Sequence, residues 1–295
     1  MNPHGHSVTG KTTKADAQAA SAGRLFRIRG LVYAVSDAAV IAWRNVIKIK
    51  RVPDVLVFVL ISPIMFVLLF AFVFGNSINI PGGSYREFLI AGIFAQTVVF
   101  GATFTGAGLA EDIQKGIINR FRALPMSRSA LLVGRTVSDV VYNALSLLIM
   151  ALTGLEVGWG ISSSPLDAAA GFGLLLVFAY AFSWVMAYVG LLVPSVEVIN
   201  NASFMVTMPL TFVANTFVPA ENLPPVLRTF ALWNPVSAVT QATRELFGNI
   251  PPGSAPPEAW PLQHPVLYTM LWAVLLIAVF APLAVHRYRT SGRRS

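Results

Sequence analysis

The sequence predicts an all-α integral membrane protein with six transmembrane helices. Of its 295 residues, 55% are hydrophobic and only 12% are charged, and the mean hydropathy is +0.67. A soluble domain of this length is not so apolar. Six apolar runs are each long enough to cross a hydrocarbon layer about 30 Å thick. These runs are residues 55–74, 88–109, 137–157, 168–193, 198–218 and 266–285.

Residues 1–30 are small, polar and basic, and they contain no apolar core of signal-peptide length. We expect a disordered cytoplasmic tail here rather than a cleaved leader. Gly5, Gly10, Lys11 and Thr12 match the spacing of a phosphate-binding P-loop. That loop needs a preceding buried strand and a following helix, and the flanking residues predict neither. We therefore expect no nucleotide site in this chain.

Residues 31–51 have the pattern of an amphipathic helix, with Trp43 among apolar residues on one side and Arg44 and Lys48 on the other. This pattern predicts an interfacial helix that lies at the membrane surface before the first span. Ordinary flanking positive charge, which sets topology and does nothing more, explains it equally well.

The basic residues are concentrated on one side of the predicted spans. An even number of spans places both termini on the same side, and 18 of the 21 lysines and arginines lie there. They belong to the N-terminal segment, the loop after the second span and the C-terminal end, where residues 288–295 form a basic tail. The positive-inside rule places this side in the cytoplasm. The same distribution explains the net charge of +8 without nucleic acid.

Two features of the spans bear on their packing. The second span contains Gly92, Gly101, Gly106 and Gly108, and small residues at such spacing allow helices to approach closely in lipid. In the third run, Asp139 follows Arg135 by four residues, so we expect the two to pair on one helix face rather than to couple ions.

The most highly charged internal loop, residues 111–135, separates the second and third spans, and we call it the elbow. At helical spacing one face carries apolar residues, namely Ile113, Ile117, Phe121 and Leu124. The opposite face carries polar residues, namely Glu111, Lys115, Asn119 and Arg122. The elbow is thus predicted to begin with a short amphipathic helix that ends at Pro125.

The elbow also carries a short motif. Glu111 and Gly116, followed by Arg120, Leu124-Pro125 and Ser127, stand in an order similar to the cytoplasmic loop of type-2 ABC exporter permeases, in particular the daunorubicin-resistance-like branch. The resemblance extends over about residues 31–287 and implies the transmembrane domain of such an exporter. It implies that the elbow is a coupling helix seated in a cleft of a separate ATPase subunit. The residues it assigns to coupling are Glu111, Lys115, Gly116, Arg120, Arg122 and Pro125. An ordinary charged loop of a membrane protein is the alternative.

Polar side chains interrupt the fifth apolar run. They are Asn200, Asn201, Thr207, Thr211 and Asn215. Polar groups within hydrocarbon usually face protein or a water-filled path, so this run is our candidate for the helix that lines the translocation path. Hydrogen bonding between helices is the alternative explanation.

Residues 219–265 are half apolar, but no apolar piece among them is long enough to span the membrane. They predict two short helices that are broken at Asn234-Pro235 and dip back into the outer leaflet. A similar re-entrant pair lies near the exit in type-2 exporters, so the resemblance implies a gate or exit at Asn234, Pro235 and Arg244. A helix kink at Pro63 in the first span suits the same gate. An ordinary folded loop outside the membrane is the alternative.

The favoured function is the membrane subunit of an ATP-driven exporter. The resemblance implies an amphipathic drug, lipid or lipid-linked glycan as cargo, a separate ATPase subunit, and a second permease copy or a paralogue. ATP and Mg would be bound by the ATPase partner, and we expect this chain to bind no cofactor or metal itself. The alternative is a secondary carrier or channel that needs no ATPase, although clear internal repeats and intramembrane ionisable sites are missing from the sequence. The chain has no cysteine and only four histidines, which leaves no catalytic constellation in the spans.

Overall fold

The structure is a computed structural model, and it describes residues 61, 64–74, 83–117, 130–251, 253 and 256–290. Within these ranges the regular elements are all helical. They are η1 (Phe70–Phe74), α3 (Tyr85–Gln114), α5 (Ala130–Glu156), α6 (Pro165–Gly190), α7 (Val196–Phe212), η2 (Ala220–Asn222), α8 (Pro225–Trp233), α9 (Pro235–Phe247), α10 (Trp260–Gln263) and α11 (Pro265–Thr290). The predicted N-terminal tail, the predicted interfacial helix at residues 31–51 and the last five residues lie outside the described part of the chain.

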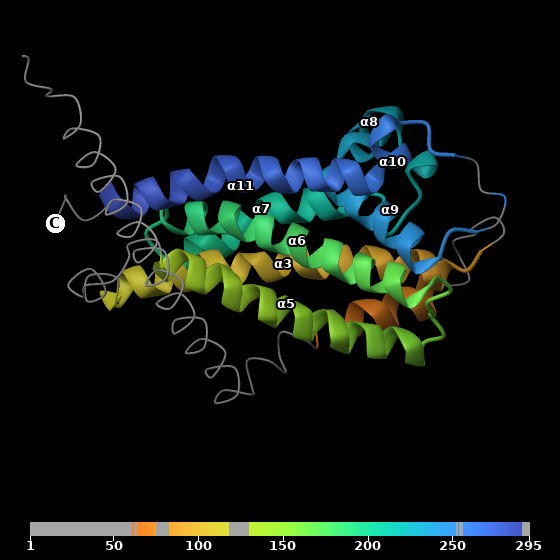
Figure 1. The fold of residues 1–295 in the computed structure, drawn as a ribbon, viewed down its shortest axis with the longest axis horizontal. Coiled ribbons are helices and arrows are strands. Elements are labelled where there is room, and N and C mark those ends of the chain that lie inside the picture. Colours follow the sequence, from red (N-terminus) through yellow and green to blue (C-terminus); the bar gives the residue numbers. More distant parts are fainter. Residues whose placement is uncertain are drawn as a thin grey trace, which may run out of the picture.

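The long helices run lengthwise side by side, and the short helices α8, α9 and α10 gather at one end (Figure 1). We call that end the short-helix end. The opposite end, where α3 and α11 finish and α5 begins, is the elbow end. Four of the described helices, α3, α5, α6 and α11, are long and apolar enough to cross a membrane. The 17-residue α7 and the apolar helix Ile64–Val73 are shorter.

Helix α3 lies at the centre of the bundle and packs against α5, α6, α7 and α9. Its most apolar stretch is 78% buried. Helix α6 crosses it where Gly106 faces Gly190, and a Cβ atom at Gly190 would lie 2.5 Å from the carbonyl oxygen of Gly106. Only two glycines permit this backbone contact, so the close packing predicted for the second span is confirmed.

Helix α11 is the most exposed of the long helices, because only 17% of its most apolar stretch is buried. Large apolar side chains cover its outer face, including Leu267, Leu271, Val274 and Leu275. An exposed apolar surface of this kind is costly in water and favourable in lipid. Together with the four long apolar helices, it supports a multi-pass membrane protein.

Four predicted boundaries are corrected by five residues or more. The sixth span continues to Thr290 rather than Val285. The second span continues to Gln114 rather than Leu109, and the third begins at Ala130 rather than Val137. The fifth ends at Phe212 rather than Val218. Beyond Phe212 the backbone N–H of Asn215 donates to the Ser237 hydroxyl at 2.9 Å. Tertiary hydrogen bonds thus replace the helical ones, a cause that hydropathy does not reveal.

Several helices begin where a polar residue caps the first turn. The hydroxyl groups of Ser84, Ser164 and Ser195 accept from backbone N–H groups at the starts of α3, α6 and α7. The Asn234 side chain does the same for α9, whose first residue is Pro235. The predicted break between two short helices at Asn234-Pro235 is therefore confirmed.

Candidate coupling site and the polar cluster at the short-helix end

The described part of the elbow, residues 111–117, begins as the last turn of α3 rather than as a separate helix. The backbone stays helical from Tyr85 through Gln114 and turns at Lys115 and Gly116, so the predicted amphipathic helix is not continuous from Glu111. Ile117 is helical again, and the rest of that predicted helix lies outside the described residues. Gly116 has φ +64°, a left-handed conformation that favours glycine. Its N–H donates to the Ile113 carbonyl at 3.0 Å. Arg120, Arg122 and Pro125 lie outside the described residues.

Glu111 and Lys115 lie one turn apart on the exposed surface of this helix end, where they form an ion pair. The hydrogen bond and the charge of Glu111 raise the pKa of Lys115 above that of an ordinary lysine. Both side chains are available to a partner, since about half or more of each is exposed. Such an exposed pair contributes little to folding.

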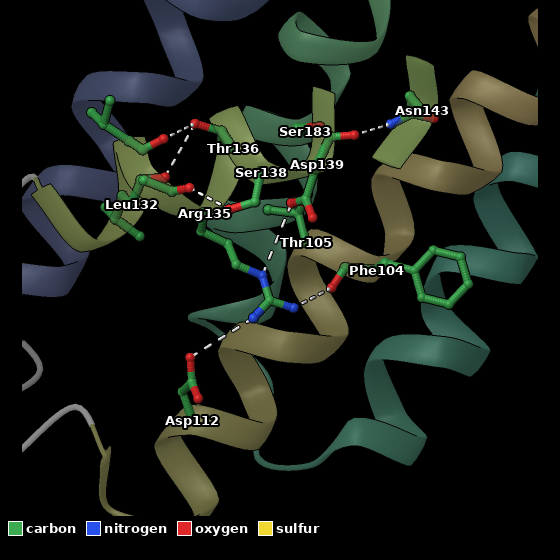
Figure 2. Close-up of polar contacts among 12 residues, drawn as sticks. Phe104, Thr105, Asp112, Leu132, Arg135, Thr136, Ser138, Asp139, Asn143 and Ser183 are labelled. Carbon is green, nitrogen blue, oxygen red and sulfur yellow. Dashed lines mark hydrogen bonds and ion pairs between the residues drawn. The ribbon is translucent and has the colours of Figure 1, made fainter. Parts of the chain in front are cut away.

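A buried charged cluster lies at the same end of the bundle, between α3 and α5 (Figure 2). The Arg135 guanidinium of α5 lies directly against Gly108 of α3. A Cβ atom on residue 108 would overlap the guanidinium. The guanidinium donates to the Phe104 carbonyl at 3.2 Å. Its nitrogens lie 4.0 Å from carboxylate oxygens of both Asp112 and Asp139.

The cluster ties the first turns of α5 to the last turns of α3. Asp139 also accepts a hydrogen bond from Thr105, which is fully buried. Near the same end the Gln114 amide donates to the Pro194 carbonyl at 3.4 Å, in the connection between α6 and α7. The predicted Arg135–Asp139 pair is confirmed. Thr105 and Asp112 were missed, although their spacing of seven residues puts them on one helix face and could have indicated them.

Replacing Arg135 with methionine should destabilise the protein strongly, because the buried Asp139 carboxylate would lose its cation. We expect a loss of roughly 3–5 kcal/mol in the free energy of unfolding. Unfolding in increasing SDS, followed by tryptophan fluorescence, would measure it. The matched control is Lys115→Met, which breaks an exposed ion pair and should leave the midpoint unchanged. Equal midpoints for Arg135→Met and the native chain would show that the cluster does not hold α3 to α5.

A second polar cluster, at the short-helix end, is centred on Arg244 of α9, which is only 3% exposed. Its guanidinium donates to the Phe88 carbonyl at 2.9 and 3.1 Å and to the Asn215 carbonyl at 2.8 Å. It also donates to the Asn215 side-chain oxygen. The guanidinium lies 3.5 Å from the centre of the Phe88 ring, a cation–π contact.

The cluster continues from Arg244 to the start of α9. The Asn234 amide donates to the Leu210 carbonyl in α7 at 2.7 Å, while its oxygen caps Val236 at 2.9 Å. Three of the predicted site residues therefore tie α9 to its neighbours: Arg244 bonds Asn215 beyond α7 and the Phe88 carbonyl of α3, and Asn234 bonds the Leu210 carbonyl of α7. Pro235 lies beside it as the first residue of α9. Pro63 lies outside the described residues.

The five polar residues predicted to line one translocation path differ in their exposure. Asn200 and Asn201 are exposed, whereas Thr207 and Thr211 are fully buried on the side of α7 that packs against α3. The two threonine hydroxyls donate to carbonyls one turn earlier in α7, at 2.8 and 2.7 Å. Asn215 lies beyond the helix, in the polar cluster around Arg244.

These features define a class: a multi-pass helical membrane protein whose central helix joins a buried charged cluster at one end to a polar cluster at the other. The model of the ABC-2 type transporter family matches residues 37–247, and the chain belongs to that family. The matched region includes both clusters and the elbow. Permeases of this family work with an ATPase subunit.

Three relatives agree with this assignment. The daunorubicin resistance ABC transporter permease protein DrrB1 of Streptomyces coeruleorubidus is 31% identical over 88% of this chain and 88% of its own length. The transport permease ycf38 of Pyropia yezoensis is 25% identical over 73% of this chain and 75% of its own. The doxorubicin resistance ABC transporter permease protein DrrC of Mycobacterium tuberculosis is 21% identical over 79% of this chain and 81% of its own length.

Proposed function

We propose that this chain is the membrane-spanning permease subunit of an ATP-driven exporter, with a separate ATPase subunit that binds and hydrolyses ATP with Mg. Its cargo would be an amphipathic drug, a lipid or a lipid-linked glycan. Two copies, or one copy and a paralogue, would form the transport unit. The observation that carries the proposal is the family match over residues 37–247, joined by the likeness to a daunorubicin resistance permease over most of both chains.

The proposal includes a membrane orientation. Among the described residues, Lys115, Arg135, Arg287 and Arg289 lie at the elbow end, and Arg86, Arg228 and Arg244 at the other. With the basic residues of the terminal segments added, the positive-inside rule favours a cytoplasmic elbow end and cytoplasmic termini. The short helices α8 and α9 would then form the re-entrant pair in the outer leaflet. Six spans result if residues 55–74 and α7 both cross the membrane.

Helix α3 would carry movement between the two sides. It is continuous for 30 residues, about 45 Å at the rise of an α-helix. Its last turn presents Glu111 and Lys115 at the elbow, and the Phe88 carbonyl in its first turn holds Arg244. A displacement of the elbow by the ATPase would therefore reach the polar cluster around Arg244 through a single rigid helix.

Purification with the native membrane and cytosolic proteins tests the proposal. We expect an ATPase to co-purify in mild detergent, and its ATP hydrolysis to fall when Glu111 is changed to Ala or Arg. Reconstituted vesicles should export an amphipathic dye only when ATP is supplied. A protein that carries no ATPase and moves solute without ATP would be a secondary carrier or channel, which would overturn the exporter proposal.

A further inference from the structure

A cavity of about 270 Å³ lies between α3, α5, α7 and the helix Ile64–Val73, next to the buried charged cluster, with which it shares Phe104. Its walls are largely aromatic, with Phe100 and Phe104 from α3, Phe204 from α7 and Phe66 from the first helix. Phe104 and Phe204 are 39% and 54% exposed, so the cavity opens on the outer surface of the bundle. Its size is near the lower end of the roughly 300–1,000 Å³ of small-molecule sites.

The α5 wall of the cavity contributes two hydroxyl groups, from Tyr142 and Ser146. These groups lie near each other, yet neither buried oxygen meets hydrogen-bond geometry with any partner among the described residues. Ser146 is only 2% exposed. A buried hydroxyl without a partner is unfavourable, so a ligand oxygen that bonded here would remove that penalty.

The lining carries no ionisable charge, since it contains no Asp, Glu, Lys, Arg or His. Gln96 and Thr97 add uncharged polar groups on the α3 side. An anionic ligand would have to lose its hydration here without a cation to pair with, which is strongly unfavourable. An uncharged ring gains both burial and contact with the aromatic walls.

We propose that this cavity binds the uncharged, ring-containing part of an amphipathic molecule, with a hydroxyl or carbonyl oxygen of that part bonded to Tyr142 and Ser146. The cavity accommodates one such part, while the rest of the molecule extends through the opening between Phe104 and Phe204. The inference deepens the proposed function, on which it rests in taking the bound molecule as cargo. It also moves the binding surface from the polar residues of α7 to the space between α3 and α5.

Photolabelling tests the cavity in the purified full chain, held in lipid nanodiscs without any ATPase. The probe is 4-(hydroxymethyl)benzophenone, which is uncharged and carries two rings, a carbonyl and a hydroxyl. Mass spectrometry should locate the label on the peptides that contain Phe100, Tyr142 and Phe204. 4-Benzoylbenzoate, which carries a carboxylate, should label these peptides at least tenfold less, because the lining offers no cation to the anion.

Three variants sharpen the test. Ser146→Leu fills the cavity and should reduce labelling at least tenfold, whereas Ser146→Ala removes one hydrogen bond and should weaken it about three- to tenfold. Thr153→Leu is the matched control on α5, because its hydroxyl bonds the Ile149 carbonyl and it does not line the cavity. Phe204→Ala removes an exposed part of the wall, and it keeps the test decisive if Ser146→Leu fails to fold.

Label spread over outward-facing residues such as Leu148 and Leu152, with no response to Ser146→Leu or Phe204→Ala, would overturn the cavity proposal. That result would leave the exporter proposal intact, since ATPase co-purification does not depend on it. Conversely, specific labelling of a chain that recruits no ATPase would support the cavity and overturn the exporter.

Discussion

Replacing Gly116 with proline is expected to leave the protein folded in the membrane and to reduce ATP-driven export to less than about a tenth. Gly116 has φ +64° and donates its N–H to the Ile113 carbonyl. Proline fixes φ near −65° and has no N–H, so the turn after α3 cannot form. The elbow would then leave α3 in another direction and lose its fit to the ATPase. Export from reconstituted vesicles, normalised to protein content, measures the effect.

The structure provides a control at the same position. A Cβ atom at Gly116 would meet nothing within 4 Å, so the constraint is the backbone conformation and not the available space. Asparagine adopts left-handed conformations more readily than other side chains, and Gly116→Asn should keep most of the export. Gly116→Val should resemble proline. Equal export from the asparagine and proline variants would mean that the turn is not what the ATPase recognises.

Replacing Arg244 with alanine should cost roughly 3–5 kcal/mol in the free energy of unfolding. The change removes the hydrogen bonds that hold the Phe88 and Asn215 carbonyls and leaves the Asn215 side chain without its arginine partner. Arg244→Lys should recover only part of the loss, because an ammonium group cannot match the planar fork of the guanidinium. The midpoint of unfolding in SDS, read by tryptophan fluorescence, reports both variants.

Arg228 supplies the comparison at the same end of the molecule. It forms an ion pair with Glu258 at 2.7 Å, with side chains 34% and 70% exposed. An exposed pair contributes less than about 1 kcal/mol, so Arg228→Ala should shift the midpoint little. A shift as large as that of Arg244→Ala would show that the loss of any arginine destabilises this end, independent of burial.

The sequence predicted much of the fold because apolar runs of sufficient length have few alternatives in a membrane. The break at Asn234-Pro235 was also predictable, since proline at the start of a helix and asparagine before it are local signals. The end of α7 at Phe212 was not. Nothing near Asn215 in the sequence indicates that its N–H bonds Ser237, a residue 22 positions later.

The site residues were predicted unevenly for the same reason. Arg135 and Asp139 are one helical turn apart, so their pairing could be inferred locally. The partnership of Arg244 with Asn215 joins residues 29 positions apart, and that with Phe88 joins residues 156 apart. The roles of Asn200, Asn201, Thr207 and Thr211 in transport stay a prediction.

The contact between Gly106 and Gly190 gives α3 the geometry of an unequal lever. Its fulcrum is this crossing, because the two backbones are too close for α3 to shift sideways against α6. From Gly106 the arm to Gln114 is about 12 Å and the arm to Tyr85 about 32 Å, at 1.5 Å per residue. A tilt that moves the elbow by 1 Å would therefore move the start of α3 by roughly 2.6 Å in the opposite direction. The long arm ends beside Arg244, where a displacement of that size exceeds the tolerance of a hydrogen bond.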